Sequence, residues 1–564
     1  MKFKQYTYKR PDMKIFEKQF NEFVSAFVDA EDAASQDAFM MKINQLRNEF
    51  ESMEQIAYIR HTINTKDAQY QGEQEFFDEQ GPIYEGLVSK YYKALTNAKH
   101  KEALRKKWGE QLFTIASLKQ KTFSPAIIED LQVENKLMSE YTKLLSSAQI
   151  FFEGEYRNLP QMRPFEMSTN RAIRKQASEA KYNFFKENEA RFDEIYDQLV
   201  KVRTKMAQKL GYKNFIPLGY ARMLRSDYTP EMVKKFRDQV KNDIVPFTTL
   251  LRERQRTRLN LDKLRYYDEV LSFNSGNPKP CGDADTILEA GKKMYEELSQ
   301  ETKIFFDYMK EHELMDLISK EGKSPGGYCT FISKFDAPFI FSNFNGTADD
   351  IDVLTHEAGH AFQMYESRTY RVPEYQFPTL DACEIHSMSM EFFAWPWMEL
   401  FFKEDAEKYR FAHLNESLLF IPYGVTVDEY QHFVYANPQA TPTERKQAWR
   451  QIEKKYLPHR DYEDEEYLEK GGYWHQQGHI FKDPFYYIDY TLAGICAFQF
   501  WKKSREDWEQ AWKDYVTLCR AGGSQPFLNL VESAKLISPF EEGCIKAVVE
   551  EIDKWLAAVN DGEL

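Results

Sequence analysis

Two histidines separated by three residues, with a glutamate directly after the first, occur at residues 356–360 (His-Glu-Ala-Gly-His). On a helix, residues four apart lie on one face one turn apart, so both imidazoles can reach a single metal ion. Glu357 then lies beside the open position of the metal, where it can take a proton from a water molecule. The spacing therefore predicts a zinc site formed by His356 and His360, with Glu357 as a general base for hydrolysis.

The sequence around this motif has the pattern of a helix. A turn at 345–346 is followed by Thr347, a candidate N-cap, with Asp350 three residues later as in a capping box. Apolar residues then recur at helical spacing over 351–365. Gly359 costs a helix about 1 kcal/mol relative to alanine, so we expect another element to approach closely there.

A catalytic zinc ion usually takes a third protein ligand and leaves one position for water. A second helix is predicted from about Thr379 to Trp395, and it carries the candidate ligands Asp381, Glu384, His386 and Glu391. Glu384 and Glu391 share a face but are roughly 10 Å apart, so both cannot ligate one ion. His386 lies about 200° around the helix from Glu384. Position alone leaves Glu384 and His386 as rivals.

Two further segments could belong to the same site. The runs 328–332 and 338–344 are rich in aromatic and β-branched residues and predict a hairpin directly before the first helix. An exposed edge strand there could pair with an extended peptide, although a purely structural hairpin is the alternative. The glycine-rich stretch 471–479 predicts a loop, and Pro484 suits a first helical position ahead of Tyr486 and Tyr490. From the residues alone, these tyrosines are more typical of a helix face in the core.

Three segments in this order resemble the thimet oligopeptidase and oligoendopeptidase F family, in its bacterial branch that includes Pz-peptidases. They are 344–362, the stretch from Glu384 to Glu391, and His479 followed by 484–490, and the resemblance covers roughly residues 170–550. It implies one Zn²⁺ ion held by His356, His360 and Glu384, with Glu391 in a supporting or structural role and His386 as a packed or surface histidine.

The resemblance also assigns roles to the 471–490 segment. It implies that this segment covers the zinc site and that His479 and Tyr490 hydrogen-bond the substrate carbonyl and the oxyanion. Tyr486 is given the same role, although its spacing differs by one residue from that of the better-described relatives.

The fold implied by the resemblance is mostly α. We expect a helical ellipsoid of two halves around a deep substrate channel, with a small β-hairpin or sheet beside the zinc helix. An N-terminal helical region is expected over residues 1–165 and a catalytic region over 166–564. Helical periodicity dominates the chain and includes the segments 80–117, 125–153, 284–318 and 404–418.

Composition limits the partners and the compartment. Lys and Arg total 75 against 89 for Asp and Glu, a formal charge of −14, which argues against a nucleic-acid binder. No apolar run approaches 18 residues and no signal-peptide pattern follows Met1, so no membrane span is expected. The six cysteines form no CxxC pair, which is typical of free thiols in the cytoplasm. The sequence does not define the oligomeric state.

The sequence thus predicts a cytoplasmic zinc endopeptidase that cleaves short, unstructured oligopeptides. Relatives in this branch include enzymes that act on collagen-derived peptides, and no residue selects between those and general substrates. One alternative is a helical zinc carboxypeptidase, which would trim single residues from the C-terminus. The other is a zinc-containing peptide-binding protein without turnover, which the intact Glu357 disfavours.

Overall fold

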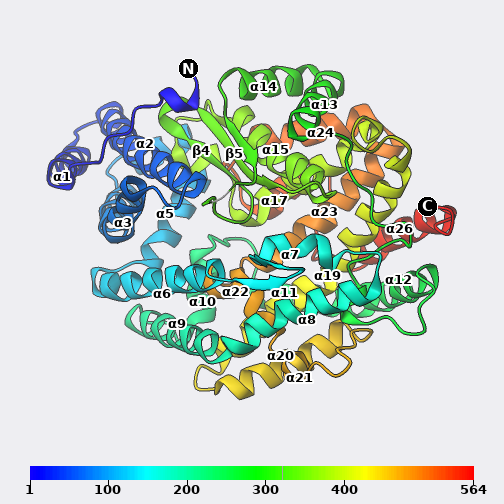
Figure 1. Ribbon diagram of the computed structural model, residues 1–564. Helices are drawn as coiled ribbons and strands as arrows, with labels where there is room; N and C mark the ends of the chain where they lie inside the picture. Colours follow the sequence, from blue (N-terminus) through cyan, green and yellow to red (C-terminus); the bar gives the residue numbers. More distant parts are fainter. Residues whose placement is uncertain (321) are drawn as a thin grey trace.

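Amphipathic helices make up most of the chain in the computed structural model, which describes residues 1–320 and 322–564 (Figure 1). Helix α2 illustrates why they form, since Met40, Ile43 and Phe50 recur on one face and are fully buried. Aspartates cap several helices, as where Asp12 accepts the backbone N–H groups of Lys14 and Ile15.

The α-helices are α1 (Met13–Asp29), α2 (Ala33–Ile63), α3 (Ala68–Thr96), α4 (Lys101–Trp108), α5 (Glu110–Thr122), α6 (Ile128–Ser146), α7 (Leu159–Glu166), α8 (Arg171–Glu187), α9 (Glu189–Lys209), α10 (Phe215–Arg222), α11 (Pro230–Gln239), α12 (Val245–Arg258) and α13 (Ala284–Leu298). They continue with α14 (Gln300–Glu311), α15 (Asp349–Ser367), α16 (Pro373–Gln376), α17 (Leu380–Phe393), α18 (Glu399–Phe402), α19 (Ala406–Ala436), α20 (Pro442–Tyr456), α21 (Glu466–Glu469), α22 (Gly478–Lys482), α23 (Tyr487–Glu506), α24 (Trp508–Ala521), α25 (Phe527–Ser533) and α26 (Cys544–Ala558). Short 3-10 segments are η1 (Phe3–Gln5), η2 (Pro125–Ile127), η4 (Tyr266–Asp268), η5 (Ser333–Phe335), η6 (Trp395–Trp397), η7 (Lys403–Asp405) and η8 (Tyr473–Gln476), and the π-helical segment η3 (Val240–Ile244) joins α11 to α12.

A three-stranded sheet lies beside α15. Its order is β3 (Met315–Ile318), β5 (Ala337–Phe344), β4 (Tyr328–Ile332), with β5 parallel to β3 and antiparallel to β4. The hairpin predicted from 328–332 and 338–344 is therefore confirmed, and β4 is an edge strand. Strand β3 falls in the segment 284–318 that was expected to be helical. A second, two-stranded sheet pairs β1 (Ile150–Phe152) with β2 (Glu155–Arg157).

Helices α15 and α17 cross in close contact, and the crossing is at Gly359. A Cβ atom at this position would lie 2.7 Å from both the carbonyl oxygen of His386 and the Cα of Ser387. Such a distance leaves no space for any side chain, so the close approach expected at Gly359 is confirmed. Two helices that touch backbone to backbone bring their side chains into a single site.

The predicted cap of the first helix is wrong. Helix α15 begins at Asp349, after an N-cap position at Ala348 that offers no side-chain acceptor. Asp350 instead accepts the backbone N–H groups of Asn345 and Gly346, at 2.8 Å each. Its carboxylate therefore stabilises the turn between β5 and α15. It does not cap the first turn of the helix.

Other helix boundaries also differ from those expected. The segment 80–117 spans three helices, and the segment 125–153 ends as helix at Ser146 before strand β1 begins. The helix expected over 404–418 is α19, which continues to Ala436 with Pro422 in its interior.

The helices are arranged in two halves (Figure 1). In this view α1, α2, α3, α5, strands β4 and β5, α13 and α14 form the upper half with α15 and α17, and α6, α8, α9, α20 and α21 form the lower half. Helices α7, α22 and α23 lie close to the boundary. The mostly helical fold with a small sheet beside the histidine-bearing helix is confirmed, and the division of the chain at residue 165 stays a prediction.

Two further findings concern the helices and the cysteines of the described part of the chain. None of its helices combines the length and apolarity that a membrane span requires. Its six cysteines are all free thiols.

Candidate active site

The crossing of α15 and α17 brings three metal-ligating side chains together. Nε2 of His356 lies 3.2 Å from Oε2 of Glu384, and Nε2 of His360 lies 3.3 Å from the same oxygen. These ligand atoms all lie within 4.8 Å of one another. Among the described residues, this is the cluster whose donor atoms converge as a metal ion requires.

The spacing of the donor atoms suits zinc. With bonds of about 2.0–2.2 Å and tetrahedral angles, zinc holds its ligand atoms about 3.3 Å apart, close to the two distances from Glu384. Two imidazoles and one carboxylate are a donor set typical of catalytic zinc, in which the fourth position stays open. The three residues present therefore fit one zinc ion.

His386, the rival third ligand, points elsewhere. It is fully buried outside the cluster, and its Nδ1 lies 3.3 Å from the carbonyl oxygen of Cys383. Its backbone carbonyl accepts a hydrogen bond from Tyr515 at 2.8 Å. Burial lowers the pKa of His386 to about 4, as expected for a neutral histidine in the core.

A series of hydrogen bonds begins at Nδ1 of His356 and holds the ring in place. Its Nδ1 lies 2.7 Å from Oε1 of Glu391, and the other oxygen of Glu391 lies 2.7 Å from Nε2 of His413. Trp395 donates its indole N–H to Nδ1 of His413 at 3.1 Å, so the proton of the neutral His413 ring is on Nε2 and is donated to Glu391. Glu391 then accepts from Nδ1 of His356, which leaves Nε2 of His356 free to bind a metal.

Glu357 lies close to this cluster, since the charges of His356, His360 and Glu384 all act on its carboxylate. Its side chain is buried, yet its carboxylate makes no hydrogen bond with any described residue. A Cβ atom built on Gly327, just before β4, would lie 3.5 Å from Oε1 of Glu357. Burial raises the pKa of Glu357 above its usual value, and the imidazoles of His356 and His360 partly oppose that rise. A carboxylate of raised pKa beside a metal is well suited to accept a proton.

Tyr486, Tyr490 and His479 lie together over Glu384. Tyr486 donates its hydroxyl to Oε1 of Glu384, and the rings of Tyr486 and Tyr490 are 5.0 Å apart. The hydroxyl of Tyr490 lies 3.4 Å from Nε2 of His479. Burial raises the pKa of both tyrosines well above the usual value, so both hydroxyls keep their protons. The structure thus gathers all the residues named from the third motif.

The backbone in this region differs from the prediction. The segment expected to be a loop contains η8 and α22, and helix α23 begins at Tyr487 and not at Pro484. Pro484 lies in the preceding turn, next to Phe485 with a φ of 69°. This turn places Tyr486 at the N-cap of α23, where its side chain reaches Glu384.

A second chain of hydrogen bonds sets the protonation of His479. Tyr423 donates to Oε1 of Gln477 at 2.8 Å, and the amide nitrogen of Gln477 lies 2.9 Å from Nδ1 of His479. Since the Gln477 amide donates, Nδ1 of His479 accepts and its Nε2 carries the proton. Burial lowers the pKa of His479, so the ring is a neutral donor near pH 7.

The sequence analysis missed four of these supporting residues, His413, Trp395, Gln477 and Tyr423. Only Gln477 had a local signal, because it lies two residues before His479 in the glycine-rich stretch. Trp395 lies four residues after Glu391 at the end of the second predicted helix, and His413 and Tyr423 come from α19, a separate segment that folds toward the site. Their side chains are of types that are common throughout a helical protein, and nothing in their spacing distinguishes them.

Comparisons with known families agree with this geometry. The profile described as the Peptidase M3 N-terminal domain matches residues 3–123, and that of Peptidase family M3 matches residues 165–550. The second match includes all the candidate site residues.

Curated relatives are more distant in sequence. Oligopeptidase PepF of Bacillus subtilis (strain 168) is 21% identical over 406 residues, 69% of this chain and 58% of that protein. The chromosomal oligoendopeptidase F of Lactococcus lactis subsp. cremoris is 27% identical over 258 residues, 44% of this chain and 40% of that protein. The matched part of the chain thus spans about half the length of these relatives.

Solved structures are more similar. A structure of Pz peptidase A with an inhibitor superposes with a TM-score of 0.98 at 62% identity and covers 100% of both chains. A structure assigned as an oligoendopeptidase F from Bacillus anthracis str. Ames has a TM-score of 0.94 at 55% identity and covers 100% of this chain and 99% of that one.

Proposed function

Since the chain belongs to peptidase family M3, we propose that it is a zinc-dependent endopeptidase that cleaves short, unstructured oligopeptides. The resemblance read from the three motifs is confirmed by that membership. The observation that carries the proposal is the convergence of His356, His360 and Glu384 next to a carboxylate that has no other partner. Collagen-derived peptides fall within the proposed class of substrates.

The proposed roles follow from the geometry. When bound, zinc would polarise the scissile carbonyl and make the water more acidic. Glu357 takes a proton from the attacking water and later gives it to the leaving amine. Tyr490 and the Nε2–H of His479 donate to the oxygen that gains charge, and one such donor contributes about 3 kcal/mol. Tyr486 positions the carboxylate of Glu384 through its hydroxyl.

Strand β4 is proposed to hold the substrate. It is an edge strand of the sheet, and Gly327, the residue just before it, lies beside Glu357. An extended peptide that adds to this edge would bring its backbone carbonyl toward the metal cluster. Backbone pairing of this kind recognises a peptide with little regard for its side chains.

One experiment separates the proposal from its alternatives. A ten-residue peptide blocked at both ends is incubated with the zinc-loaded protein, and the products are identified by mass. We expect internal cleavage, which a chelator abolishes. No cleavage of this peptide, with release of single residues from the same peptide when its C-terminus is free, would indicate a carboxypeptidase. Binding of both peptides without cleavage would indicate a peptide-binding protein.

Substrate size gives a further prediction. A folded domain must unfold to present an extended strand to a buried edge, at a cost of about 5–15 kcal/mol. We therefore expect efficient cleavage of unstructured peptides of roughly 5–20 residues and negligible cleavage of a stable folded protein. Gel electrophoresis of a stable globular protein after long incubation measures this. The same protein after reduction and alkylation is the control, and rapid digestion of the native form would contradict the prediction.

The hydrogen bonds that link His356 through Glu391 to His413 give another prediction. His413→Leu removes the donor to one oxygen of Glu391 and leaves Trp395 without its acceptor. We expect zinc affinity to fall by about 10- to 100-fold, because partners of this kind orient the ligand imidazole. Competition with a fluorescent chelator measures the affinity. His413→Gln keeps a donor within reach and should retain most of it, so an equal loss in both variants would contradict the orienting role.

A further inference from the structure

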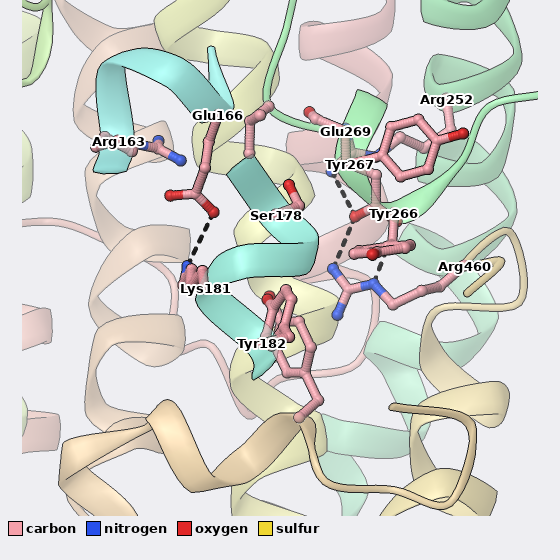
Figure 2. A pocket seen from close by; sticks show the side chains of 12 residues that line it. Arg163, Glu166, Ser178, Lys181, Tyr182, Arg252, Tyr266, Tyr267, Glu269 and Arg460 are labelled. Atoms are coloured by element: carbon pink, nitrogen blue, oxygen red, sulfur yellow. Dashed lines mark hydrogen bonds and ion pairs between the residues drawn. The ribbon is translucent and has the colours of Figure 1, made fainter. Parts of the chain in front are cut away.

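A cavity of about 200 Å³ lies beside the amino-terminal end of α15, between α7, α8, α12 and the 266–270 segment (Figure 2). Arg163 of α7 connects it to that end of the helix, because its Nε lies 3.8 Å from Oδ2 of Asp349. Its charged lining residues are four cations and two anions, namely Arg163, Lys181, Arg252 and Arg460 against Glu166 and Glu269. The lining therefore carries an excess of positive charge.

Both anions of the lining are already paired. Glu269 accepts two hydrogen bonds from Arg460, at 3.2 and 2.7 Å, and lies 3.6 Å from Arg252. Glu166 accepts a hydrogen bond from Lys181 at 3.1 Å. These contacts hold Lys181, Arg252 and Arg460 in place, so none of the pocket carboxylates is left to bind Arg163.

Arg163 is the cation of the lining that is not paired with a carboxylate of the lining, since its ion pair, at 3.8 Å, is with Asp349 outside it. Among the described residues it makes no hydrogen bond, and Figure 2 shows its guanidinium directed toward the cavity with no dashed line to the other lining residues. Burial alone would lower the pKa of Arg163, but Asp349 and Glu166 raise it above the usual value, so the group is charged. A guanidinium whose N–H groups make no hydrogen bond presents a fork of donors that matches the two oxygens of a carboxylate.

Neutral donors complete the lining. The hydroxyls of Ser178, Tyr266 and Tyr473 line the cavity and make no hydrogen bond with a described residue. An anion that enters the cavity would therefore meet the charged guanidinium of Arg163 and several hydroxyl groups that donate no other hydrogen bond.

The direction of strand β4 indicates which end of a bound peptide approaches this cavity. A Cβ atom on Gly327 would lie 3.1 Å from Val353 and 3.5 Å from Glu357, whereas Cys329 lies 3.8 Å from Met364 (sulfur to sulfur). Strand β4 and helix α15 therefore run in the same direction. A peptide that pairs antiparallel with β4 runs toward the amino-terminal end of α15, and its C-terminal part approaches Arg163.

The distance fits a short peptide. Asp349 and His356 are seven positions apart (356 − 349 = 7), which corresponds to about 10 Å of helix. An extended chain advances about 3.3 Å per residue, so three residues reach Arg163 from the scissile bond and one or two more fill the cavity.

We propose that this cavity binds a carboxylate of the substrate on the C-terminal side of the scissile bond, namely the α-carboxylate of a peptide that ends three to five residues beyond it. The inference rests on the proposed peptidase function and adds a reason for a limit on substrate length. A longer peptide would not place its α-carboxylate in the cavity, and a shorter one would not reach Arg163. The side chain of a glutamate at the same place offers the same chemistry.

The test uses quenched-fluorescent peptides with a blocked N-terminus and one cleavage site, ending four residues beyond it as the free acid or the amide. For the wild type we expect kcat/KM about tenfold higher for the acid, mainly through KM. Arg163→Gln should lower the value for the acid to that of the amide and leave the amide unchanged. The matched control Arg191→Gln, at a surface arginine paired with Glu140 and Glu194, should change neither.

Further substrates identify the source of the carboxylate. An amidated peptide with glutamate as its last residue is compared with its glutamine counterpart. A faster glutamate peptide in the wild type, but not in Arg163→Gln, shows that a side-chain carboxylate also binds. Equal rates show that only the α-carboxylate does.

Two results would overturn the proposal. One is equal cleavage of acid and amide by the wild type, which requires no variant and so does not depend on how Arg163→Gln folds. The other is an equal loss on both peptides in a folded Arg163→Gln. If the zinc-loaded wild type cleaves neither peptide, the peptidase function itself fails, and that outcome is distinct from both.

Discussion

Glu357→Gln is expected to lower kcat by about two to four orders of magnitude while zinc content stays at one ion per chain. Glutamine has nearly the same shape but cannot accept the proton of the attacking water. Because Glu357 makes no hydrogen bond with a described residue, the change removes no structural contact. Metal analysis, thermal unfolding and steady-state kinetics on one peptide together measure the effect.

The control for this variant is on the same helix. Glu366→Gln makes the same chemical change nine positions later (366 − 357 = 9), at a residue whose carboxylate pairs with Arg520 at 2.8 Å. Loss of a partly exposed ion pair is expected to cost less than about 1 kcal/mol and to leave kcat unchanged. Near-normal turnover in Glu357→Gln would remove this residue from the mechanism.

Glu384→Ala is expected to lose zinc affinity by more than about 100-fold and activity with it, because the remaining imidazoles hold the ion less firmly than the complete set. The variant also frees the hydroxyl of Tyr486, which donates to Glu384. Dialysis against a zinc buffer followed by metal analysis measures the affinity, and circular dichroism checks that the helices persist.

His386→Asn is the companion variant, since His386 was the rival ligand on the same helix. Its side chain is fully buried away from the cluster, so zinc content and kcat should be retained even if the protein unfolds at a lower temperature. The reverse pattern, with zinc lost from His386→Asn and kept by Glu384→Ala, would show that the third ligand has been assigned to the wrong residue.

The sequence predicted the parts of the site that lie on one helix. His356, Glu357 and His360 share a face by helical geometry alone, and the hairpin before them follows from local residue types. The choice between Glu384 and His386 could not be made from spacing. It depends on which face of α17 packs on α15, and that is set by the crossing at Gly359.

The parts that were missed depend on contacts distant in sequence. His413 and Tyr423 reach the site only because α19 folds back over it, and neither residue has a local pattern that signals this. Strand β3 was missed because its parallel partner β5 lies more than twenty residues away, beyond the range of any short pattern. The wrong cap at Thr347 has a local cause, because the carboxylate of Asp350 turned back toward the strand.

The crossing at Gly359 also bears on which ions the protein can take up. The helices that carry the ligands touch through their backbones, with no flexible side chain between them that could yield. The separation of the two ligand-bearing backbones is thus fixed by the main chain before any ion arrives. An ion that takes longer bonds and six to eight oxygen ligands, such as calcium at about 2.3–2.6 Å, fits two imidazoles and one carboxylate poorly, so we expect this scaffold to favour small ions over large ones.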